Sequence, residues 1–158
     1  MRISAKADYA VRAAAELAAS PDGAPRTAED LAATQQVPRK FLEAILTALR
    51  GAGLVVSQRG LGGGYRLARP ADEVSVADVV RAVDGPLVFV RGERPSELDY
   101  QGAAAPLLHV WVALRANVRH VLESVTLADL AGNNLPAEVQ NLLAHEAAWE
   151  SPESLRGQ

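Results

Sequence analysis

Apolar residues between positions 39 and 50 recur at three- and four-residue spacing, which is the period of an amphipathic helix. They are Leu42, Ile45, Leu46 and Leu49. The polar residues between them are expected to face outward: Arg39, Lys40, Glu43, Thr47 and Arg50. Gly51 and Gly53 are expected to end this helix, because glycine tolerates the left-handed backbone of a helix C-cap.

A shorter helix is predicted just upstream. Thr27 suits its N-cap, and Glu29 and Asp30 place negative charge in its first turn, where unpaired backbone amides favour anions. A tight turn at 36–38 follows, with Pro38 expected in the first turn of the second helix. Two helices joined by so short a turn are typical of a helix-turn-helix.

A β-hairpin is predicted next, because residues 54–57 and 65–68 have strand-like composition on either side of a glycine-rich tip at 60–64. Helix-turn-helix plus hairpin predicts a winged arrangement. One helix then lies in the DNA major groove, and the hairpin tip reaches the neighbouring backbone or minor groove. Arg59, Arg66 and Arg69 can neutralise phosphates there.

Two alternatives compete with this interpretation. The helices and hairpin could be scaffold alone, because helix-turn-helix patterns are loose. The glycines could instead cradle a nucleotide, since Gly60 and Gly62 begin a GxGxxG pattern. Tyr65 occupies its last position, however, and the run leads into a strand rather than into the N-terminus of a helix.

Helices are expected on both sides of this unit. Ser75 and Asp78 predict a capped helix that ends at Gly85. Its valines are expected to pack on a first helix whose apolar stripe has mostly small residues: Tyr9, Ala10, Ala13, Ala14 and Leu17. The overall prediction is a mainly α protein with a small β-hairpin wing, in which residues 1–85 form a winged helix-turn-helix DNA-binding domain.

Residues 103–125 carry a heptad-like apolar seam, with alternating spacings of four and three. Such a seam could pack against the body of its own chain, but a helix with Trp111 at its centre favours a second copy. We expect a long helix that pairs with an antiparallel second copy through Leu107, Trp111, Leu114, Val118, Val121 and Val125. A homodimer would set two recognition helices roughly 34 Å apart, which predicts a palindromic operator. The dimerisation helix and C-terminal helices are expected to span 103–149.

The last part of that region is expected to be helical as well. Thr126 suits the N-cap of a short helix that Gly132 ends. A final amphipathic helix is predicted over 137–149, with Val139, Leu142 and Leu143 facing inward. The polar tail, 150–158, is expected to be disordered.

Charge is distributed unevenly along the 158 residues. Residues 1–70 carry ten Lys and Arg against six Asp and Glu, and residues 71–158 carry six against thirteen, which gives the net charge of −3. A basic N-terminal part and an acidic C-terminal part are expected when only one face of a protein contacts DNA phosphates.

Three segments resemble the Rrf-two (Rrf2) family of bacterial repressors, which includes IscR, NsrR and CymR: MRISAKADYAVRAAAELA, VPRKFLEAILTALRGAGLV and RGLGGGYRLARP. The resemblance covers about residues 1–130 and implies a homodimer that binds double-stranded DNA through the recognition helix and wing. With the outward Thr47, it gives the predicted DNA-contacting set: Arg39, Lys40, Glu43, Thr47, Arg59, Gly60, Gly62 and Gly63. Glu43 could accept a hydrogen bond from a cytosine amino group. Ala44 lacks the polar side chain that some members carry there.

The chain has no cysteine, whereas many members of that family hold an iron–sulfur cluster with three cysteines in the segment that matches 85–105. Thiolates are the usual cluster ligands, and His109, His120 and His145 have no metal-ligand spacing. We therefore expect no cofactor and no metal, and exclude direct iron–sulfur or thiol sensing.

The segment 86–102, which matches the family's sensor region, is expected to be a partly ordered loop. Three kinds of control stay open: a small apolar or anionic ligand, a complex with a metabolic enzyme of the CymR type, or constitutive repression. Residues suited to a ligand are Phe89, Arg91, Arg94, Tyr100 and Trp111. The alternative is a plain surface loop whose arginines are solvated.

Other classes of protein fit the sequence less well. Acidic residues are scattered over predicted helix faces and no nucleophile lies in a recognisable motif, so an enzyme is not expected. Neither a signal peptide nor a run of 18 apolar residues is present, which predicts a cytoplasmic protein without membrane contact.

Overall fold

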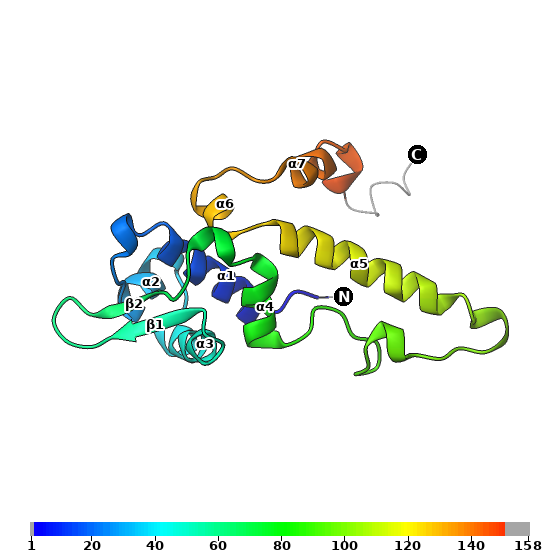
Figure 1. Cartoon of the computed structure of the whole chain (residues 1–158), viewed down its shortest axis with the longest axis horizontal. Coiled ribbons are helices and arrows are strands. Elements are labelled where there is room, and N and C mark those ends of the chain that lie inside the picture. The colour runs from blue at the N-terminus through cyan, green and yellow to red at the C-terminus, as the bar shows by residue number, and fades with distance from the viewer. Residues whose placement is uncertain (1, 151–158) are drawn as a thin grey trace.

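The computed structural model describes residues 2–150, and it is mainly helical with one two-stranded antiparallel sheet (Figure 1). The helices are α1 (Ala5–Ala18), α2 (Ala28–Gln35), α3 (Arg39–Gly51), α4 (Val76–Asp84), α5 (Leu107–Ser124), α6 (Leu127–Ala131) and α7 (Ala137–Leu143). The strands are β1 (Val55–Gln58) and β2 (Gly64–Leu67). The predicted fold class, mainly α with a hairpin wing, is confirmed.

The core lies where α1 meets α3, α4 and α6. Alanines of α1 are buried against these helices, and their small size lets the backbones approach closely. The predicted stripe of α3 is fully buried: Leu42, Ile45, Leu46 and Leu49. Each such leucine contributes roughly 1.5–3 kcal/mol by burial. This core fixes α3 with its opposite face outward.

Side-chain caps begin the helices where the sequence predicted them. Thr27 Oγ1 accepts a hydrogen bond from the amide of Asp30 at 3.1 Å, and Ser75 with Asp78 forms a reciprocal capping box. Thr126 and Asp129 form a second box. Pro38 departs from its expected place: it stands at the N-cap of α3 and not in the first turn, because Gln36 turns the chain with φ of 54°.

The hairpin pairs Val55 with Leu67 at its base and Gln58 with Gly64 at its tip end. An additional bridge joins β2 to Arg26, which lies just before the N-cap of α2. The Arg26 amide donates to the Tyr65 carbonyl at 2.8 Å, and the Tyr65 amide donates to the Arg26 carbonyl at 2.7 Å. Sequence reasoning missed this bridge. It attaches the wing to the helix-turn-helix on a second side.

The segment 86–102, expected to be partly ordered, is folded in the structure. Val90 and Glu93 exchange two backbone hydrogen bonds across a tight turn, and Pro95 begins a short 3₁₀ helix. Val88, Pro95 and Leu98 are buried. These apolar side chains give the segment a small core of its own against α5.

Two expectations for the C-terminal half were wrong. Val125 lies beyond the end of α5 and is buried within its own chain, so it is not on the outer surface of that helix. The last helix, α7, ends at Leu143 instead of residue 149, and Leu142 and Leu143 are exposed rather than inward-facing. Most of the tail predicted to be disordered, 150–158, lies outside the described residues.

Candidate nucleic-acid interface

The outer face of α3 carries the side chains predicted to read DNA. Arg39, Lys40, Glu43 and Thr47 are all exposed, while the leucines on the opposite side are buried. Ala44 lies among them and offers no hydrogen bond. The helix therefore presents a short polar strip, with room for close approach at Ala44.

Arg39 is held by two carboxylates. Its Nε donates to Glu43 Oε1 at 3.0 Å, and its Nη1 lies 3.7 Å from Glu29 Oε2 on α2. Exposed pairs of this kind contribute less than about 1 kcal/mol, so a phosphate can displace either partner. No ion pair to Lys40 occurs within residues 2–150, which leaves its ammonium available to an anion.

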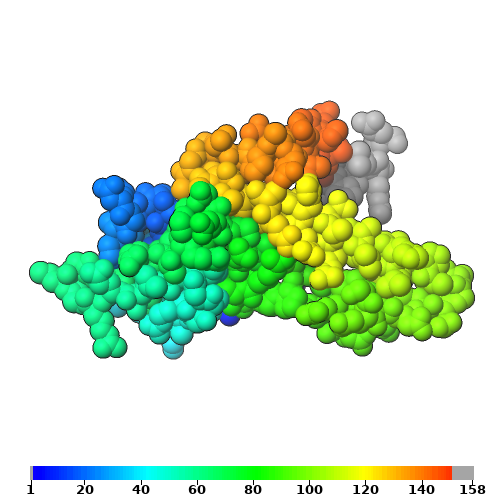
Figure 2. All heavy atoms as spheres, viewed as in Figure 1, coloured from blue at the N-terminus to red at the C-terminus, as the bar shows by residue number. Residues whose placement is uncertain are grey.

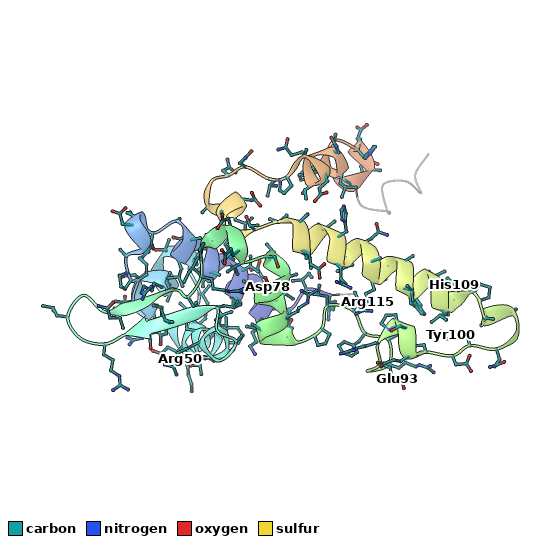
Figure 3. The ribbon with its side chains drawn as sticks, viewed as in Figure 1. Arg50, Asp78, Glu93, Tyr100, His109 and Arg115 are labelled. Carbon is teal, nitrogen blue, oxygen red and sulfur yellow. The ribbon has the colours of Figure 1, made fainter. Side chains whose placement is uncertain are left out.

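Thr47 and Arg50 are engaged within the protein. Thr47 Oγ1 donates to the Glu43 carbonyl at 2.9 Å, so only its lone pairs face outward. Arg50 Nη1 donates to Ser57 Oγ of β1 at 3.4 Å, a link between α3 and the wing that sequence reasoning missed (Figure 3). Thr47 can thus accept a hydrogen bond from a base or water, but its hydroxyl proton is already donated within the helix.

The wing projects from the body as a thin protrusion (Figure 2). Its tip is a closed turn in which the Gly63 amide donates to the Gly60 carbonyl at 3.0 Å. Gly60 and Gly62 have φ of 95° and 73°, which favours glycine. A Cβ on Gly63 would overlap the carbonyl oxygen of Gln58, so this glycine is required by the turn itself. Arg59 stands exposed at its base.

Side chains from α1 steady the start of α3. Tyr9 packs edge-on against Phe41 with ring centroids 5.6 Å apart, and Arg12 lies over the Tyr9 ring at 5.2 Å. Arg12 Nε also donates to Gln35 Oε1 at 2.9 Å. This cluster ties α1, α2 and α3 together. It could not be predicted from periodicity, because its members come from three separate elements.

The long helix α5 leaves an apolar strip uncovered. Val110 is 54% exposed and Leu114 37% exposed, and Ile3 nearby is 59% exposed. A shallow apolar hollow continues the strip, lined by Ile3, Asn117, Val118, Val121 and Leu122. Of the predicted seam, Leu107, Trp111, Val118 and Val121 are half-buried in their own chain. Val110, which the seam omitted, is more exposed than any of them.

Trp111 turns toward the folded 86–102 segment. Its Nε1 donates to Tyr100 Oη at 3.1 Å. The Arg91 guanidinium lies 5.8 Å from the centre of the Tyr100 ring, and Figure 3 shows Tyr100 beside α5. A cavity of about 390 Å³ remains between the segment and α5, lined by Arg2, Leu87, Val88, Phe89, Val90, Trp111 and Leu114. Phe89 and Trp111 thus line the cavity as expected, but Arg91, Arg94 and Tyr100 do not. Arg2 supplies the cation instead.

Comparison with known proteins identifies the family. A family model described as an iron-dependent transcriptional regulator, Rrf2, matches residues 3–133. This chain belongs to the Rrf2 family. It is therefore a DNA-binding transcriptional regulator, and the names of its relatives are those of regulators and not of enzymes.

Relatives match this Rrf2 protein over most of its length. A Mycobacterium tuberculosis protein that carries the name of an HTH-type transcriptional regulator is 52% identical over 96% of this chain and 94% of its own. The structure of CymR, the global cysteine regulator of Bacillus subtilis, superposes with a TM-score of 0.71 at 32% identity, covering 84% of this chain and 98% of CymR. The structure of T. potens IscR gives 0.69 at 30% identity, covering 98% and 96%.

An iron–sulfur cluster does not fit this Rrf2 protein, although the family's description names iron. The sequence offers no thiolate. Within residues 2–150, no three His, Asp or Glu side chains come together as a metal site, and His120 Nε2 instead lies 3.4 Å from Glu138 Oε2. In the same part of the chain, no helix is long and apolar enough to cross a membrane.

Proposed function

We propose that this Rrf2 protein is a repressor that binds a palindromic operator as a homodimer, with α3 in the major groove and the wing tip against the minor groove. The division of α3 into a buried leucine face and a polar outer strip carries the proposal. A helix held this firmly presents Lys40 and Glu43 at fixed positions along a groove. A protein that binds genomic DNA in this way is expected in the cytoplasm.

The second protomer is expected on the exposed strip of α5. An uncovered valine and leucine on a helix of 18 residues, continuous with Ile3 and the apolar hollow, favour burial against an equivalent surface. Pairing through this strip would set the two α3 helices roughly one DNA turn apart. Affinity would then depend on both copies, because the net charge of one chain is −3.

We further propose that a small-molecule effector controls DNA binding. The cavity beside Trp111 is mainly apolar, with the Arg2 guanidinium as its one charged lining group. An aromatic or branched carboxylate matches that lining, since its apolar body would contact Phe89 and its anion would meet Arg2. Control by a protein partner is the alternative, for which the exposed Leu142 and Trp149 offer a surface.

Genomic selection tests the main proposal. The purified full chain is incubated with sheared genomic DNA, and bound fragments are sequenced and footprinted. We expect recovered sites with two-fold symmetry, and loss of recovery with Lys40→Ala combined with Arg59→Ala. Lys6→Ala is the matched control, because Lys6 donates to the Val83 carbonyl within the protein. Recovery of the same fragments by the double variant would exclude α3 and the wing as the binding surface.

Fluorescence separates the two kinds of control. Replacing Trp149 with Phe leaves Trp111 as the sole tryptophan, and Trp111 lines the cavity. Titration with a panel of aromatic and branched carboxylates should then quench or shift its emission and change operator affinity. If no compound changed the emission or the operator affinity, and one defined enzyme co-purified with the protein, control by a protein partner would be favoured instead.

A further inference from the structure

Leu61 lies at the apex of the wing, where its side chain is fully exposed. Its relative exposure is 108%, and neither Gly60 nor Gly62 has any atom within 4 Å of the place where a Cβ would lie. One exposed leucine is ordinary on a protein surface. Its position is informative, however, because the tip from 59 to 64 carries only two side chains, those of Arg59 and Leu61.

The apex is held in place despite its exposure. The Gly63 amide closes the turn onto the Gly60 carbonyl, and Gly63 and Gly64 are packed so closely on Gln58 and Arg26 that neither position has room for a Cβ. A turn fixed at its base presents Leu61 outward at little entropic cost. Apolar side chains that insert between base pairs from the minor groove have this exposed, fixed position.

We propose that Leu61 inserts into the DNA minor groove as a wedge at a pyrimidine–purine step and bends the operator there. This inference rests on the proposed function, which brings the wing to the minor groove. Arg59 would follow the negative potential of a narrow A·T-rich groove, and Leu61 would contact sugar and base edges without a hydrogen bond. TA and CA/TG steps unstack most easily, so specificity would arise at base pairs that receive no polar contact.

The test uses an operator recovered by genomic selection, labelled at its two ends for energy transfer and with 2-aminopurine at the central step of each wing contact. Wild-type protein should bend the duplex and raise the 2-aminopurine emission. Leu61→Ala should abolish most of both signals and lower affinity about tenfold. Its salt dependence should stay unchanged, since leucine neutralises no phosphate. Leu61→Met should retain both signals.

Leu142→Ala is the matched control, because Leu142 is also an exposed leucine but lies on α7. Replacing the pyrimidine–purine step by a purine–purine step should reduce wild-type affinity more than that of Leu61→Ala. Unchanged bending and affinity in Leu61→Ala would overturn the wedge while leaving the regulator's DNA binding intact. Failure of the wild-type protein to bind any fragment would instead overturn the proposed function.

Discussion

Ser75 and Thr126 face each other in an antiparallel bridge, and each caps the helix that follows it. The Val76 amide donates to the Val125 carbonyl and the Leu127 amide to the Val74 carbonyl, both at 2.9 Å. The end of α5 is thereby fixed to the start of α4, next to the core that holds α3. In the proposed dimer, a rotation of α5 would therefore move α3 with it.

The carboxylate of Glu123 adds a pH-dependent link at this junction. Hydrogen bonds from Arg119 of α5, and then from Arg81 of α4, lower the pKa of Glu123 from its usual 4.5. A lowered carboxyl pKa stabilises the fold fully above 4.5, and this contribution is lost as the pH falls through the lower folded value. Because the group is about one-third exposed, solvent screening limits the effect to about 0.5 kcal/mol.

We therefore expect Glu123→Gln to lower the free energy of unfolding at pH 7, and the difference from wild type to shrink by pH 3. Urea denaturation at the two pH values measures this. Glu97→Gln serves as control, since Glu97 is exposed on a 3₁₀ helix and makes no ion pair within the described part of the chain. If Glu123→Gln lowered the free energy of unfolding equally at both pH values, the charge of Glu123 would not be the cause.

Two valines of α5 separate dimerisation from helix stability. Val110 and Val112 are 54% and 40% exposed, but two residues place them about 200° apart around the helix. Val110→Asp should therefore convert the protein to a monomer, because it buries a charge at the two-fold contact, while Val112→Asp should remain a dimer. Sedimentation velocity at micromolar concentration distinguishes them. Equal behaviour of the two variants would contradict pairing through this strip.

Glu43 and Glu29 both pair with Arg39, which allows base reading to be separated from charge. Glu43→Ala should relax the preference at one base pair by about 1 kcal/mol, the lower end of the range for a bidentate contact, because a single hydrogen bond to a base edge is lost. Glu29→Ala changes the net charge equally but lies on α2, so it should keep the preference. Competition binding on single-base operator variants measures both. The same loss in both variants would assign the effect to charge alone.

Gly63 tests how far DNA affinity depends on the shape of the wing. Gly63→Ala would drive a Cβ into two backbone carbonyl oxygens of the turn, at a cost of about 1–3 kcal/mol. Operator affinity should fall at least about tenfold, and circular dichroism should show the helices retained. Gly51→Ala has open space around its Cβ and is expected to be neutral or slightly stabilising. Full affinity in Gly63→Ala would show that the tip is not used.

Local patterns predicted the helices and caps of the N-terminal half of the molecule well. The leucines of α3 repeat with the helical period, and the caps at Thr27, Ser75 and Thr126 need only residues three positions away. Such features are decided within one or two turns of chain. The resemblance of three segments, the wing among them, then supplied the family, which the comparisons confirm.

Features decided by tertiary packing escaped prediction. The seam of α5 follows the heptad spacing, but α5 packs on both α4 and the 86–102 segment, so Trp111 turns inward and Val110 outward. The bridge between Arg26 and Tyr65 joins residues that no local pattern relates. Arg2, which precedes α1, lines the cavity for the same reason, since no local pattern relates it to α5.

Binding of the operator by a homodimer is tested most directly by the mass of the protein–operator complex, measured by sedimentation velocity on a recovered operator at two salt concentrations. We expect two protomers on each duplex and an affinity that falls steeply as salt increases, because both copies neutralise phosphates. One protomer for each duplex, or binding that salt leaves unchanged, would contradict it.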